Sequence, residues 1–88
     1  METGQDVLAL RLRAELRNER RLAHRTQKQV AQAMDWSPSK MLRIETGAVG
    51  ISITDLRALL SYYNINDERQ TEELVELARA SRGKRSSL

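Results

Sequence analysis

The stretch that decides the fold is residues 27–46, which read QKQVAQAMDWSPSKMLRIET. Apolar side chains recur at three- and four-residue intervals on both sides of Asp35, as in two short amphipathic helices. Ala31 is small enough to let a second helix cross the first, and Asp35 can take the positive φ of a tight turn. Five apolar residues are expected to fill the angle between the helices: Val30, Met34, Trp36, Met41 and Ile44. This spacing predicts a helix-turn-helix motif.

Capping residues and apolar spacing divide the rest of the chain into further short helices. A first helix is expected over about 6–22, because Leu12 and Leu16 belong to an apolar series at helical spacing. The expected boundaries of the other helices are marked by Thr26, by Ser37 before Pro38, by Gly47, by Ser52, and by Asn66 or Asp67. His24 and Asn64 are expected in the links, because both residue types tolerate left-handed backbone.

No segment has the alternating pattern of a strand, so the sequence predicts an all-α domain. We expect five helices over residues 6–82, preceded by a frayed segment 1–5 and followed by a basic flexible tail 83–88.

The composition excludes several classes of function. The chain has 88 residues, no Cys, one His, and a net charge of +3 from 15 Lys+Arg and 12 Asp+Glu. Without Cys there is no thiol nucleophile or Cys-ligated metal, and one His cannot form a multi-His site, so we expect neither cofactor nor metal. No nucleophile–base pair, carboxylate dyad or phosphate loop is present, which predicts that the protein is not an enzyme. With no apolar run of about 20 residues and no signal peptide, it is expected in the cytoplasm, with no membrane partner.

The second helix of the motif presents a distinctive outward face. At about 100° per residue, Met41 and Ile44 share the buried side of this helix. The opposite side carries four residues and no acid: Ser39, Leu42, Arg43 and Thr46, with Lys40 at its flank. An Arg can read guanine, hydroxyls can bond base edges or phosphates, and an aliphatic side chain can contact a thymine methyl. For Arg43 the alternative is a solvated surface charge, and for Leu42 it is an ordinary exposed leucine.

The motif residues resemble a known family. Thr26-Gln27, then Ser37-Pro38-Ser39-Lys40, then Arg43-Ile44-Glu45-Thr46-Gly47 is similar to the Cro/C1-type (xenobiotic-response-element, XRE) helix-turn-helix family of bacteria and phages. The similarity runs from about Leu12 to Ile65, and WSPSK, RIETG and SITDLRALL resemble the actinobacterial branch. The resemblance implies a lambda-repressor-like DNA-binding domain, either standing alone or preceding a C-terminal regulatory domain.

The resemblance also implies roles for the matching positions. Pro38, Ser39 and Arg43 match base-reading positions, and Leu42 lies on the same outward face. Phosphate contacts are implied for Arg17, Thr26, Gln27, Lys40 and Thr46. Arg20 and Glu45 match a pair that joins the first and third helices by a salt bridge. Trp36 is expected in the core rather than stacked on a base, and Tyr62 is expected to be more exposed than Tyr63.

Two functions compete at this point. The first is a sequence-specific transcriptional regulator in the bacterial nucleoid, acting as a homodimer on double-stranded DNA through half-sites about one helical turn apart. Its dimer surface is expected around residues 62–82 or in a missing C-terminal domain. The second is a protein-interaction or antitoxin-like module that uses the same helical scaffold, since a fold does not determine a function. Acids or a large apolar patch on the outward face would favour the second function, and the sequence has neither there.

Overall fold

Five α-helices form the computed structural model, which describes residues 4–82. The helices are α1 (Gly4–Leu22), α2 (Gln27–Met34), α3 (Pro38–Thr46), α4 (Ile53–Tyr62) and α5 (Glu68–Ser81). No strand occurs among these described residues, and the prediction of an all-α fold with five helices is confirmed. Helix α1 begins at Gly4, two residues before the expected start. The predicted basic tail 83–88 lies outside the described residues, as do residues 1–3 of the segment expected to fray.

The helices begin at residues whose side chains satisfy otherwise unpaired backbone N–H groups. The observed N-caps of α2 to α5 are Thr26, Ser37, Ser52 and Asp67. At α2 the capping is reciprocal: the Thr26 hydroxyl accepts from the Gln29 backbone N–H at 3.1 Å, and the Gln29 side chain accepts from the Thr26 N–H at 2.9 Å. Each such cap stabilises its helix by about 1 kcal/mol. The predicted starts of α2, α3 and α4 are therefore confirmed, and Asp67 rather than Asn66 caps α5.

Left-handed backbone closes the links between helices. The described residues with positive φ are His24, Asp35, Asn64 and Gly47, all at expected positions. Glycine is required at the end of α3, where φ is +87° and a Cβ would overlap the guanidinium of Arg13.

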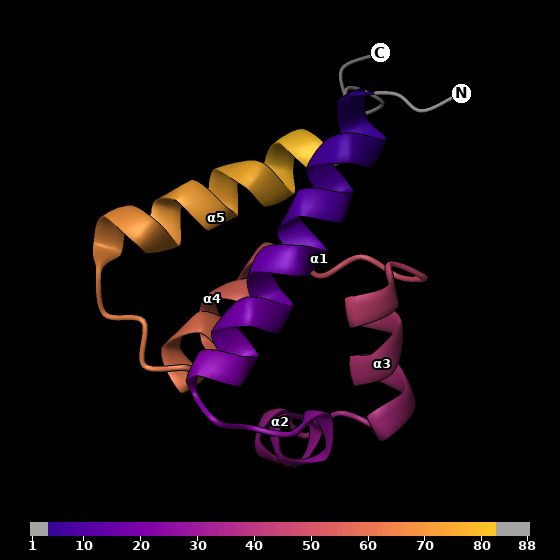
Figure 1. Ribbon diagram of the computed structural model, residues 1–88, viewed down its shortest axis with the longest axis vertical. Coiled ribbons are helices and arrows are strands. Elements are labelled where there is room, and N and C mark those ends of the chain that lie inside the picture. Colours follow the sequence, from indigo (N-terminus) through magenta and orange to yellow (C-terminus); the bar gives the residue numbers. More distant parts are fainter. Residues whose placement is uncertain (1–3, 83–88) are drawn as a thin grey trace.

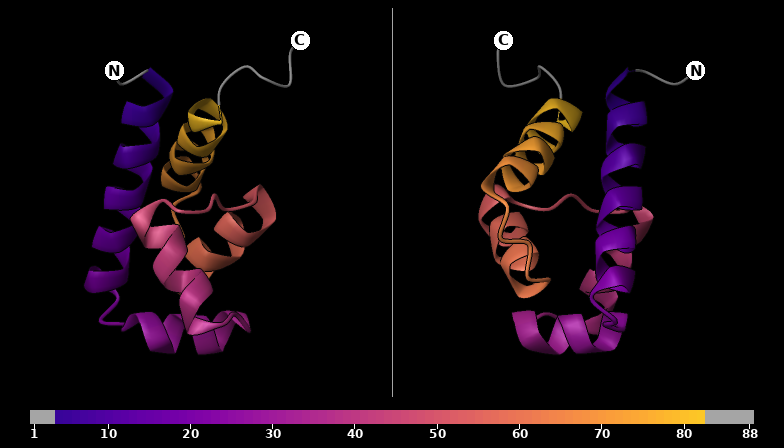
Figure 2. Two further views of the ribbon diagram at one scale, coloured as in Figure 1. Left: turned by 90° about the vertical axis from the view of Figure 1, so that its right-hand side faces the viewer. Right: turned by 60° about the vertical axis from the view of Figure 1, so that its left-hand side comes forward.

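The core lies between α1 and the other four helices. Helix α1 packs against α3 and α5, α2 packs against α3, and α4 packs against α5. Figures 1 and 2 show the long α1 crossing the molecule beside α3, with α2 lying across its C-terminal end. The buried side chains of this core are predominantly aliphatic, and Trp36 is partly buried against them. Tyr63 is buried and Tyr62 is half-buried, in the predicted order. None of the helices within residues 4–82 combines the length and apolar character needed to cross a membrane.

Candidate functional site

The segment from α2 to α3 forms a compact helix pair. Helix α2 ends at Met34, Asp35 turns the chain with φ 60°, and α3 begins at Pro38. The Trp36 N–H donates to the Ala31 carbonyl at 2.8 Å, which closes the turn. Ala31 is almost fully buried, so its small side chain permits the close crossing of the two helices. Figure 2 shows α3 rising from the end of α2 at a steep angle.

The outward face of α3 is polar at three of its four positions and is free of acids. Its residues Ser39, Leu42, Arg43 and Thr46 are all exposed, as is Pro38 at the start of the helix. Arg43 is held loosely, because its Nε donates to the Ser39 carbonyl at 3.4 Å. Within residues 4–82 its two Nη atoms have no hydrogen-bond partner, so the forked end of the guanidinium is available to a ligand.

A buried carboxylate fixes α3 against α1 and α2. Glu45 is 1% exposed, and its two oxygens accept from Arg20 Nε at 2.8 Å and Arg20 Nη2 at 3.1 Å. The Gln27 side-chain amide donates to the same carboxylate at 2.8 Å. The hydrogen bond to Glu45 raises the pKa of Arg20 above its ordinary value, which burial only partly opposes. The Arg20–Glu45 salt bridge implied by the resemblance is therefore present, and it orients the exposed face of α3.

The residues expected to contact phosphate already have partners within the protein. Arg17 Nη2 donates to the Glu45 backbone carbonyl at 3.2 Å, and the Gln27 side-chain amide donates to the Glu45 carboxylate. Lys40 Nζ lies 3.6 Å from Asp55 Oδ2, and the Thr46 hydroxyl donates to the Arg43 carbonyl at 3.3 Å. Arg17 and Gln27 therefore both contact Glu45, whereas Lys40 and Thr46 are held by separate contacts.

Two features of this site were not predicted from the sequence. The first is a half-buried array in which the Lys40 ammonium lies 4.7 Å from the Trp36 ring centroid and 3.6 Å from Asp55. The second is the hydroxyl of Tyr63, which is buried and has no hydrogen-bond partner among the described residues. Burial, and then the negative charge of Glu45, raises the pKa of this hydroxyl. Apolar periodicity indicated that Tyr63 faces inward, but it carried no signal for the position of the hydroxyl.

We expect Tyr63→Phe to leave the free energy of unfolding at neutral pH unchanged or to raise it by up to about 1 kcal/mol, because an unpaired buried hydroxyl is removed. The variant is also expected to lose part of the alkaline destabilisation. An unfolded tyrosine releases its proton near pH 10, whereas the folded protein retains that of Tyr63, so stability falls as the pH rises above about 10. Urea unfolding between pH 7 and 11 measures both effects. A Tyr63→Phe protein that keeps the wild-type alkaline slope, or that is less stable than the wild type at pH 7, would contradict the prediction.

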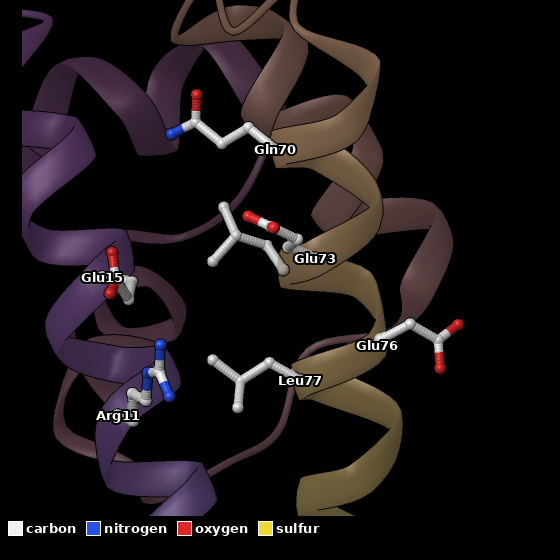
Figure 3. Close-up of a pocket in the computed structure, with 7 residues that line it drawn as sticks. Arg11, Glu15, Gln70, Glu73, Glu76 and Leu77 are labelled. Atoms are coloured by element: carbon white, nitrogen blue, oxygen red, sulfur yellow. The ribbon is translucent and has the colours of Figure 1, made fainter.

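A hollow of about 360 Å³ lies between α1 and α5, away from the α2–α3 pair. Figure 3 shows Arg11 and Glu15 on one wall and the Gln70 and Glu73 side chains on the other, while Glu76 points away. The lining combines side chains of both charges with two leucines. Gln70 Nε2 donates a hydrogen bond to Glu19 Oε2 at 3.0 Å.

Comparison with known proteins identifies the family of the chain. A family model described as "Helix-turn-helix domain" matches residues 11–74, from the middle of α1 to the middle of α5. The matched range contains the whole α2–α3 pair, the Glu45 contacts and the outward face of α3. Searches of curated proteins and of solved structures found no match.

Proposed function

Because the chain belongs to the helix-turn-helix domain family, we propose that it is a sequence-specific DNA-binding transcriptional regulator, or the DNA-binding part of one, and not an enzyme. In this proposal α3 is the recognition helix and enters the major groove. The observation that carries the proposal is the outward face of α3, an exposed and acid-free surface on which the Arg43 guanidinium fork has no partner within residues 4–82.

We assign base reading to the exposed residues of α3: Pro38, Ser39, Leu42 and Arg43. Arg43 can bond guanine N7 and O6 with both Nη atoms, and Leu42, which is 50% exposed, can contact a thymine methyl. Ser39 can bond a base edge or a phosphate, while Pro38 offers apolar contact only.

We assign phosphate contact to five residues around the helix pair: Arg17, Thr26, Gln27, Lys40 and Thr46. Such contacts set the register of a protein on the duplex without reading its sequence. The N-terminus of α2, which begins at Gln27, also favours a nearby anion. Arg21, Arg25 and Lys28 add exposed positive charge next to this helix start. The positive excess of the chain therefore lies where the proposal requires it.

We further propose that two copies bind a pseudo-palindromic site in the bacterial nucleoid, because a helix-turn-helix of this kind reads only a few base pairs alone. The copies would meet around residues 62–82 or through a regulatory domain or partner outside this chain.

Selection of bound duplexes from a random DNA pool, repeated at two salt concentrations, tests the proposed function. We expect an enriched motif with two related half-sites, and a loss of affinity of at least about tenfold between 50 and 200 mM salt, because phosphate contacts release counterions. Absence of any enriched sequence, together with a salt-insensitive complex with a protein, would instead support the protein-interaction function.

A further inference from the structure

We propose that Asp55, in the first turn of α4, restrains Lys40 and thereby limits the affinity of the protein for any DNA duplex. The inference rests on the proposed function, since it concerns how one of the phosphate-contacting cations is controlled. It identifies Asp55 as a positioning residue that acts through Lys40 and touches no DNA itself.

The Lys40 ammonium is held between two groups from other parts of the chain. Its Nζ lies 3.6 Å from Asp55 Oδ2 and 4.7 Å from the centroid of the Trp36 ring. Trp36 belongs to the turn before α3, and Asp55 belongs to α4. Among the ion pairs formed within residues 4–82, this is the one that uses a cation of α2 or α3.

The two contacts of Lys40 differ in what a phosphate would do to them. The Asp55 contact is longer than an ordinary N–H···O hydrogen bond, and the Lys40 and Asp55 side chains are 42% and 36% exposed. Such an exposed pair contributes little to stability and is screened by salt, so an incoming phosphate can replace Asp55. The cation–π contact with Trp36 involves no anion, so it does not have to be given up when Lys40 exchanges Asp55 for a phosphate.

Asp55 therefore opposes DNA binding in two ways. A phosphate must compete with its carboxylate for Lys40, and the carboxylate that is left behind repels the phosphates nearby. Neither effect depends on base sequence, so Asp55 lowers the affinity for specific and non-specific duplexes alike.

The test is the binding of Asp55→Asn to the selected duplex and to a scrambled duplex of the same length, measured by fluorescence anisotropy. At about 0.1 M salt we expect Asp55→Asn to bind both duplexes roughly 3–10-fold more tightly than the wild type binds them. Because Lys40 contacts the same phosphate in both proteins, the slope of log K against log salt should differ by less than the value of about 0.9 that one phosphate contact contributes for each bound copy. Asp55→Ser, which also removes the charge and suits a helix start, should give the same gain.

Two controls separate the action of Asp55 from a general change in charge. Glu72→Gln removes one negative charge from a pair with Arg57 and should change affinity less than about twofold. In a Lys40→Ala background, the gain from Asp55→Asn should fall below about twofold, because the restrained ammonium is absent and only the repulsion between Asp55 and the phosphates remains. A gain as large in that background as in the wild type, or one no larger than that of Glu72→Gln, would overturn the inference. If the wild type binds neither duplex, the proposed function itself fails.

Discussion

Replacement of Glu45 by Ala is expected to lower the free energy of unfolding by about 3–5 kcal/mol. The carboxylate is almost completely buried and accepts hydrogen bonds from Arg20 and Gln27. Its loss would leave the guanidinium of Arg20 without a counter-charge and the Gln27 amide without its acceptor. A domain of this size has a total stability of only about 4–12 kcal/mol, so the variant should be close to unfolding at physiological temperature.

The chain contains a matched control for this experiment. Arg57 and Glu72 also form an ion pair at 2.8 Å, but their side chains are 44% and 47% exposed. Glu72→Ala should therefore lower the free energy of unfolding far less than Glu45→Ala does. Urea unfolding followed by circular dichroism compares the two variants directly. If Glu45→Ala and Glu72→Ala were equally mild, the buried carboxylate would not be what fixes α3 against α1.

A double replacement distinguishes the loss of a favourable pair from the creation of an unpaired charge. Arg20→Met combined with Glu45→Met removes both charges and should be clearly more stable than Glu45→Ala. Recovery in the double variant would show that most of the cost of Glu45→Ala arises from the uncompensated guanidinium.

The local parts of the fold were predictable because their causes are local. The start of α3 depends on Ser37 and Pro38, which are adjacent in sequence, and its end depends on Gly47. The turn depends on the left-handed conformation of Asp35. Each of these signals acts within a few residues, so spacing alone was sufficient to place the helix pair.

The contacts that complete the site were not predictable by the same means. Gln27 and Glu45 are 18 residues apart, and Lys40 contacts Asp55 on a different helix. Apolar periodicity identifies the buried face of a helix but not the side chain that a polar group on another helix will meet. Only the Arg20–Glu45 pair was expected, and that expectation came from the family resemblance rather than from spacing.

Arg43→Ala is expected to weaken binding to the selected duplex by about 1–3 kcal/mol, which is a roughly 5–150-fold loss of affinity. The Arg43 guanidinium is exposed on the outward face of α3, and its Nη atoms are unoccupied within residues 4–82. If they bond a guanine, their removal should relax the preference at one base-pair position and leave the other positions unchanged. Selection with the variant protein measures this change, and anisotropy measures the loss of affinity.

The specificity of this effect is what connects α3 to base reading. Lys40→Ala should weaken the selected and scrambled duplexes by the same factor, because a phosphate contact carries no sequence information. Arg79→Ala removes an exposed arginine of α5 that is paired with Glu76, and it should leave the sequence preference unchanged. An Arg43→Ala protein that bound as tightly and as selectively as the wild type would contradict the assignment of α3 as recognition helix. A selective loss at one base pair requires the side chain to lie in the groove, since neither net charge nor helix stability distinguishes one base pair from another.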